Sequence, residues 1–149
     1  MSNSNDPTWM ARPGVTIHAH APADAVVASV IESFVAVGFS QRSAPGAEPV
    51  DLRHGSQTTT TLAEVVTEVV PVAFLAPVWN QRKVMRARIR TLESSGAASV
   101  VRVDARFDEL RTLTVPLFTD AVQSALSSLT ARGINFRADD YTDSGRKGW

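Results

Sequence analysis

Five arginines at alternate positions of two neighbouring segments are the residues whose type and spacing best indicate binding chemistry. They are Arg86, Arg88, Arg90, Arg102 and Arg106. Alternate residues of a strand point to the same face of a sheet, and a guanidinium can bind two oxygens of a phosphate or carboxylate at once. The pattern therefore predicts a basic surface that binds an anionic ligand or partner. The alternative is a solvated sheet face whose arginines pair locally with Asp104, Glu93 and Asp108.

The charge of the chain is balanced overall but segregated along the sequence. Its 149 residues carry 15 Lys+Arg and 15 Asp+Glu. Residues 82–111 contain 8 basic and 4 acidic side chains, whereas residues 1–81 contain 3 and 7. A chain without net basicity is not expected to coat nucleic acid, and the arginine segments contain no regular aromatic platform for stacking bases. We therefore expect no DNA partner.

A second surface is predicted in the charge-free apolar stretch at residues 69–79. Phe74, Leu75 and Trp79 are its candidates for a hydrophobic interface or pocket. The stretch is too short to cross a bilayer, and we expect no transmembrane segment elsewhere. It is compatible with a buried connector, with an interface to a second copy or another protein, and with a membrane surface or pocket lining.

Two histidines and the missing motifs bear on catalysis. His18 and His20 would share one face of a strand, but a metal site needs a third ligand, so we expect solvent-exposed histidines and no metal. The sequence has no cysteine, which excludes thiol nucleophiles and thiolate metal sites. It also lacks the nucleophile-elbow, P-loop, dinucleotide-binding and zinc-protease motifs. We expect no catalytic residues, no cofactor and no enzymatic activity.

The arginines are positioned by a predicted β-hairpin formed by residues 84–92 and 99–107. Apolar and arginine residues alternate in both segments, and Ser95-Gly96 supplies the turn. Because the two apolar faces must coincide, Ile89 should oppose Val103 and Arg88 should oppose Asp104. A three-residue loop around Gly96 would give this register.

The remaining periodic segments complete an α+β fold. Strands are predicted at 15–21 and 50–53, and helices at 22–37, about 60–70, and from Thr114 to Arg132. The result is an antiparallel sheet of three or four strands, in the order β-α-β-(α)-β-β-α, with two main helices packed on one face. In architecture this is similar to the helix-grip and TATA-binding-protein-like classes.

The length suits one domain, which we place at residues 13–137, between a flexible N-terminal arm (1–12) and a flexible C-terminal tail (138–149). Residues 1–9 do not resemble a signal peptide, so we expect a cytoplasmic protein. Its expected function is a non-enzymatic binding or interaction module that self-associates or binds an anionic partner. The alternative is a carrier of a small apolar ligand or lipid, held in a cavity between the sheet and the C-terminal helix. A metal enzyme built on the two histidines is the third hypothesis.

Overall fold

The structure is a computed structural model that describes residues 7, 10–55, 85–107 and 111–144. Within these ranges the chain forms a seven-stranded antiparallel sheet and two helices. In chain order the elements are β1 (Pro13–Ala19), α1 (Ala23–Ala36), β2 (Phe39–Gln41), β3 (Val50–His54), β4 (Met85–Ser94), β5 (Ser99–Phe107), α4 (Arg111–Ala131), β6 (Phe136–Ala138) and β7 (Thr142–Asp143).

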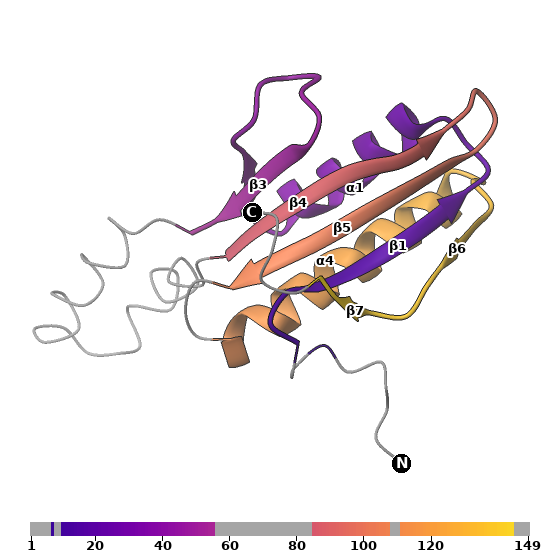
Figure 1. The fold of residues 1–149 in the computed structure, drawn as a ribbon. Coiled ribbons are helices and arrows are strands. Elements are labelled where there is room, and N and C mark those ends of the chain that lie inside the picture. The colour runs from indigo at the N-terminus through magenta and orange to yellow at the C-terminus, as the bar shows by residue number, and fades with distance from the viewer. Residues whose placement is uncertain (1–6, 8–9, 56–84, 108–110, 145–149) are drawn as a thin grey trace, which may run out of the picture.

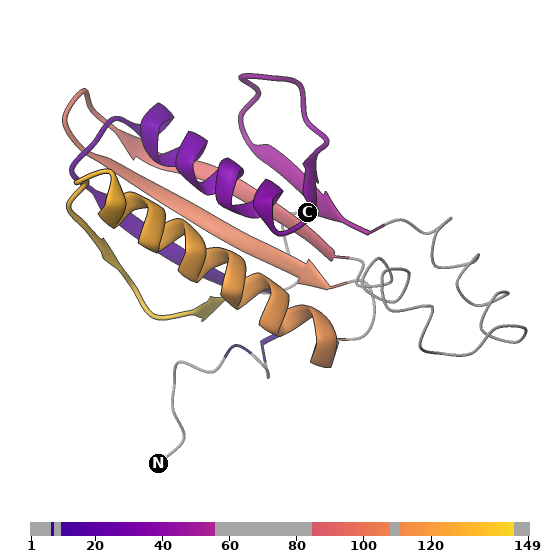
Figure 2. The same ribbon diagram turned by 180° about the vertical axis from the view of Figure 1, so that it is seen from behind.

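The molecule has two layers. The sheet has the strand order β2-β3-β4-β5-β1-β6, and β7 also pairs with β1. Helices α1 and α4 lie side by side across one face of this sheet, and neither of these two helices covers the other face (Figures 1 and 2). The predicted α+β class, with two helices on one sheet face, is confirmed. Neither described helix has the length and apolarity that a membrane span requires.

The inner face of the sheet supplies half of the core. On β4 and β5 the alternate apolar residues are almost completely buried; they are Met85, Ala87, Ile89, Val101, Val103 and Ala105. Helix α1 contributes Phe34, whose ring meets Phe39 at 4.9 Å and Phe118 of α4 at 6.1 Å, both edge to face. The alternate apolar residues of the strands therefore pack against an apolar stripe on each helix and form one layer.

Helices α1 and α4 contact each other through small polar residues. Ser29 of α1 is fully buried, and its hydroxyl lies 3.0 Å from that of Ser128 on α4. Helix α1 ends at Ala36, and the chain turns away at Gly38, whose φ of 105° lies in the left-handed region that glycine adopts without strain.

The predicted register of the β4–β5 hairpin is confirmed. Ile89 pairs with Val103, and Arg88 pairs with Asp104. The predicted three-residue loop is wrong, however, because the register shifts between Thr91 and Glu93, so that Ser94 pairs with Ser99. The extra residue is Leu92, which is half exposed. A β-bulge of this kind lets one strand add a residue without turning its inner face outward.

The predicted number of strands was too low. The additional strands β2, β6 and β7 have three, three and two residues, which is too short for an alternating pattern to identify them. Helix α4 begins at Arg111, about one turn before the predicted start at Thr114, and contains Pro116. The predicted helix at 60–70 and the apolar stretch at 69–79 lie outside the described residues.

The sheet continues past the predicted domain boundary at residue 137. The backbone N–H groups of Ala11 and Arg12 donate to the Asp143 carboxylate, each at 3.1 Å. Tyr141 packs edge to face against Phe118, with ring centroids 6.2 Å apart. Residues on both sides of the predicted boundary thus contact the same core.

The docking of Tyr141 can be tested by titration. Burial, followed by the nearby charge of Asp120, raises the pKa of Tyr141 to about 12, compared with roughly 10 in an unfolded chain. The stabilisation from this neutral ring is therefore complete below pH ~10 and is lost as the pH rises towards 12. Tyr141 is the only tyrosine of the chain, so tyrosinate absorbance reports it directly. We expect a midpoint near 12 in the native protein and near ~10 in denaturant; equal midpoints would contradict the packing.

Candidate functional site

The outer face of the sheet carries a row of three arginines that pair directly across three strands. Arg53 of β3 pairs with Arg86 of β4, and Arg86 pairs with Arg106 of β5. We call these three residues the arginine row. Like charges that face each other across a ladder destabilise the pairing. The row is therefore an arrangement that needs negative charge close by.

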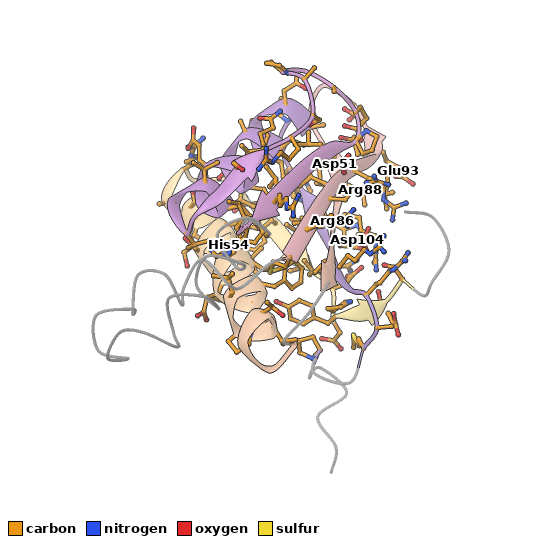
Figure 3. All side chains as sticks on the ribbon, turned by 90° about the vertical axis from the view of Figure 1, so that its left-hand side faces the viewer. Asp51, His54, Arg86, Arg88, Glu93 and Asp104 are labelled. Atoms are coloured by element: carbon orange, nitrogen blue, oxygen red, sulfur yellow. The ribbon has the colours of Figure 1, made fainter. Side chains whose placement is uncertain are left out.

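In the next row of paired residues on the same face, negative and positive charges alternate. Asp51, Arg88 and Asp104 pair across β3, β4 and β5, so that their charges alternate. Arg88 donates to both oxygens of Asp51, from Nε at 2.7 Å and from Nη2 at 3.4 Å. This bidentate geometry fixes the guanidinium plane. Asp51, Arg86, Arg88 and Asp104 all lie on the side of the sheet opposite to His54, which points towards the helices (Figure 3).

Asp104 is the centre of a third group of contacts. Its side chain is completely buried, and it accepts hydrogen bonds from Arg90 Nη2 at 2.7 Å and Arg102 Nε at 2.8 Å. The Ser144 hydroxyl donates to the same carboxylate. Arg90 and Arg102 pair across the ladder, so the buried carboxylate offsets their mutual repulsion.

Arg102 also ties the C-terminal strand region to this cluster. Its Nη1 donates to the Thr16 hydroxyl at 3.1 Å, and its Nη2 lies 2.8 Å from the Ser144 hydroxyl and 3.3 Å from the Thr142 carbonyl oxygen. With these contacts and Asp104, its side chain is mostly occupied by the fold. Arg102 therefore stabilises the sheet, and Asp104 is its main partner.

Gly14 makes room for the buried carboxylate. It pairs with Asp104 across β1 and β5. A Cβ atom at this position would lie 2.2 Å from Asp104 Oδ1 and 2.6 Å from Arg102 Nη2. These distances are far below van der Waals contact, so any side chain at residue 14 would displace the pair.

A groove on the outer face includes the arginine row and extends towards the end of β2. Its volume is about 340 Å³, and it is lined by Arg42, Asp51, Arg53, Arg86, Arg88 and Arg106. We call it the arginine groove. Arg42 reaches it because its backbone N–H donates to the Asp51 carbonyl oxygen at 2.7 Å, which continues the β2–β3 pairing by one residue. The described lining contains five guanidinium groups and a single carboxylate.

One donor at this groove has no hydrogen-bond partner among the described residues. Nε of Arg53 is buried and unpaired there. Nε of Arg90 is in the same condition, but Arg90 is anchored through its Nη2 to Asp104. Buried donors without a partner are rare because they lose their bonds to water. Arg53 thus combines a like-charged neighbour with an unsatisfied donor.

The structure divides the five arginines predicted from the sequence into two sets. Arg86, Arg88 and Arg106 line the groove, whereas Arg90 and Arg102 bind Asp104. Arg42 and Arg53 were missed. Asp51 and Arg53 alternate in the strand at 50–53, a signal that they share one face, but nothing local to Arg42 or Arg53 indicates which strand lies beside it. Phe74, Leu75 and Trp79 lie outside the described residues.

The two histidines lie at the opposite end of the outer face. A hollow of about 640 Å³ there is lined by His18, His20, Glu93, Phe136 and Arg137 together with smaller residues. His18 Nε2 lies 2.8 Å from Asp139 Oδ2, and this hydrogen bond lowers the pKa of Asp139 below its ordinary value. No set of three His, Asp or Glu side chains suited to a metal ion occurs in the described ranges.

The importance of Asp104 can be measured by replacing it. An asparagine keeps the shape but loses the charge and one acceptor oxygen, which leaves Arg90 and Arg102 facing each other. We expect Asp104→Asn to lower the free energy of unfolding by about 3–5 kcal/mol, as for a buried ion pair that loses one partner. The control is Asp51→Asn, whose carboxylate is 39% exposed and should cost at most ~1 kcal/mol. Urea unfolding measures both, and equal losses would show that Asp104 has no special importance.

The space at Gly14 gives a second test. We expect Gly14→Ala to destabilise the protein by about 1–3 kcal/mol, because the new methyl group overlaps the carboxylate. Gly96→Ala is the matched control, since a Cβ there meets no atom within 4 Å and should change stability by less than ~0.5 kcal/mol. Thermal unfolding of the two variants should separate them; a Gly14→Ala protein as stable as the control would mean that the pair moves at no cost.

Comparison with known proteins adds no functional assignment to this geometry. No protein-family model matches the sequence, and no curated protein matches it. The chemistry of the arginine groove is therefore the basis for the function proposed below.

Proposed function

We propose that this protein is a non-enzymatic binding module whose arginine groove holds an anionic group of its ligand or partner. The observation that carries the proposal is the arginine row. Three arginines in direct cross-strand register line one groove together with Arg42 and Arg88, and guanidinium groups gathered on one concave surface attract and bind anions.

The fixed geometry of Arg88 supports the same proposal. Asp51 holds Arg88 in a bidentate pair at the wall of the groove. A guanidinium that is already oriented loses less conformational entropy when it binds a ligand. The groove therefore combines a cluster of guanidinium groups with at least one preorganised fork.

The composition of the groove favours binding over catalysis. Its described lining consists of arginines and Asp51, and the Asp51 carboxylate already accepts two hydrogen bonds from Arg88. The lining thus supplies electrostatic attraction, while its single carboxylate is engaged in positioning Arg88.

The apolar-ligand alternative receives less support. A cavity between the sheet and the C-terminal helix would be lined by Phe118. In the structure this ring is completely buried and packs against Phe34 and Tyr141. The described part of this layer is occupied by the side chains of the core.

The proposal is tested with a sulfated heparin oligosaccharide as a general anionic probe. We expect the protein to bind it with an affinity that falls as salt increases. The double variant Arg42→Gln/Arg53→Gln removes two cations of the groove and should weaken binding at least about tenfold, since a hydrogen bond to a charged group contributes ~1.5–3 kcal/mol.

Arg132→Gln is the matched control for this experiment. It removes one positive charge that lies just after α4, where Arg132 pairs with Glu32 of α1. Its binding should equal that of the unchanged protein when measured by isothermal titration. A loss of binding free energy in the control at least half as large as in the double variant would show that only net charge matters, and the proposed site would be wrong.

A further inference from the structure

We infer that the hollow lined by His18 and His20 is a second binding site and that its ligand is a dipeptide with both termini free. We call this hollow the histidine hollow. The ammonium group of the dipeptide contacts Glu93, and its carboxylate contacts Arg137 on the opposite side. The inference goes beyond the anion proposed for the arginine groove, because that groove is lined by a different set of residues at the other end of the outer face.

One row of cross-strand neighbours gives the histidine hollow a cationic side and an anionic side. Arg137 of β6 pairs with His18 of β1. Val100 of β5 lies between His18 and Glu93 of β4 and pairs with both. All four residues line the hollow, and residues that pair directly share one face of a sheet. The row therefore leads from an arginine to a carboxylate across an apolar residue.

The β-bulge in β4 directs Glu93 into this row. Thr91 pairs with Val101 and Glu93 pairs with Val100, so that Leu92 is passed over. In an unbroken ladder Leu92 would pair with Val100, and this end of the row would be apolar. Bulges are frequent where a sheet re-aims a side chain next to a site. The bulge thus brings a carboxylate to the histidine hollow in place of a leucine.

Both charged ends of the row are open to solvent. Glu93 is exposed and lies on the same side of the sheet as Arg88 (Figure 3). The Arg137 side chain is 73% exposed, and its Nε lies 3.5 Å from Asp139 Oδ1. An exposed pair of this kind contributes little, and the other oxygen of Asp139 is bonded to His18 Nε2 at 2.8 Å. The terminal nitrogens of Arg137 can therefore bind a carboxylate of the ligand.

The centre of the hollow is apolar. The outer-face positions of β5 are Val100, Arg102, Asp104 and Arg106, so Val100 is the apolar member of this series. Ala98 continues the alternation just before β5 and also lines the hollow. A ligand that lies across Val100 and Ala98 needs uncharged, partly apolar atoms between its charged ends. The backbone and small side chains of a dipeptide have this character.

The spacing of the strands sets the length of the ligand. Strand β4 lies two strand spacings from β1 and three from β6, which is about 10 Å and about 14 Å. Side chains stand roughly perpendicular to a sheet, so the charged groups of Glu93 and Arg137 are separated by a comparable distance. An extended dipeptide measures roughly 7 Å, and a hydrogen bond of about 3 Å at each end lets it bridge this gap. A single amino acid is about half as long and reaches one side.

His20 offers a partner for the central amide of the dipeptide. Its backbone N–H donates to the Asn135 carbonyl oxygen at 2.8 Å, and it follows His18 on the same face of β1. His20 is exposed and lines the hollow. The volume of about 640 Å³ falls within the range of roughly 300–1,000 Å³ for small-molecule sites. The hollow therefore has the size, the polar groups and the two charges that a dipeptide requires.

The test is isothermal titration of the full chain with four probes: alanyl-leucine, its N-acetylated form, its C-terminal amide and free leucine. We expect alanyl-leucine to bind at least about tenfold more tightly than each of the others, since a hydrogen bond to a charged group has this value. The two blocked forms each lack one charged end, and free leucine is too short to reach both sides.

Two variants assign each terminus to its side of the hollow. Glu93→Gln should weaken the binding of alanyl-leucine at least about tenfold and leave that of the N-acetylated form unchanged, because this form has no ammonium group. Arg137→Gln should weaken alanyl-leucine to a similar extent and leave the C-terminal amide unchanged. The matched control is Glu32→Gln, which removes a carboxylate of α1 that pairs with Arg132 and should not alter the affinity for alanyl-leucine.

The outcomes separate this site from the arginine groove. If alanyl-leucine does not bind, or if free leucine or a blocked form binds as tightly, the inference is wrong, while the heparin titration still tests the proposed function by itself. If Arg42→Gln/Arg53→Gln weakens alanyl-leucine as much as Glu93→Gln does, the dipeptide binds in the arginine groove and the inference is also wrong. Loss of heparin binding in that double variant with unchanged binding of alanyl-leucine supports two separate sites.

Discussion

The outer face of this protein depends on one buried carboxylate. Asp104 is completely enclosed and accepts hydrogen bonds from Arg90, Arg102 and Ser144. A buried charge is tolerated only when it is paired and hydrogen-bonded. The absence of a side chain at Gly14 makes this enclosure possible. The same carboxylate therefore allows two arginines to face each other in the centre of the sheet and draws the C-terminal segment onto β1.

This arrangement divides the arginines according to their electrostatic environment. Arg90 and Arg102 share the buried carboxylate, and Arg88 lies between Asp51 and Asp104 in a row of alternating charge. The arginine row contains no carboxylate at its own register positions, and Arg42 adds a further cation to the groove. Carboxylates thus alternate with arginines in the middle of the sheet, whereas five guanidinium groups line one concave surface towards β2 and β3. The site follows from where the acidic residues are placed.

The sequence predicted the parts of this structure that depend on local periodicity. The strict alternation around Ile89 and Val103 fixed the hairpin register, because any other register would have exposed one apolar face. The short strands could not be predicted, since two or three residues define no period. Arg42 and Arg53 were missed for a different reason. They reach the groove through the pairing of β2, β3 and β4, and that pairing is set by tertiary contacts far along the chain.

The arginine row also links binding to stability. The unsatisfied Nε of Arg53 raises the free energy of the folded state. An anion in the groove meets arginines of three strands only in the folded protein, because the unfolded chain does not bring Arg53, Arg86 and Arg106 together. By linkage, a ligand that binds only the folded protein then stabilises the fold by an amount that rises with the logarithm of its free concentration once that concentration exceeds the Kd. The balanced cluster around Asp104 holds the sheet together without a ligand, so the protein can gather five arginines at one end without losing the structure that presents them.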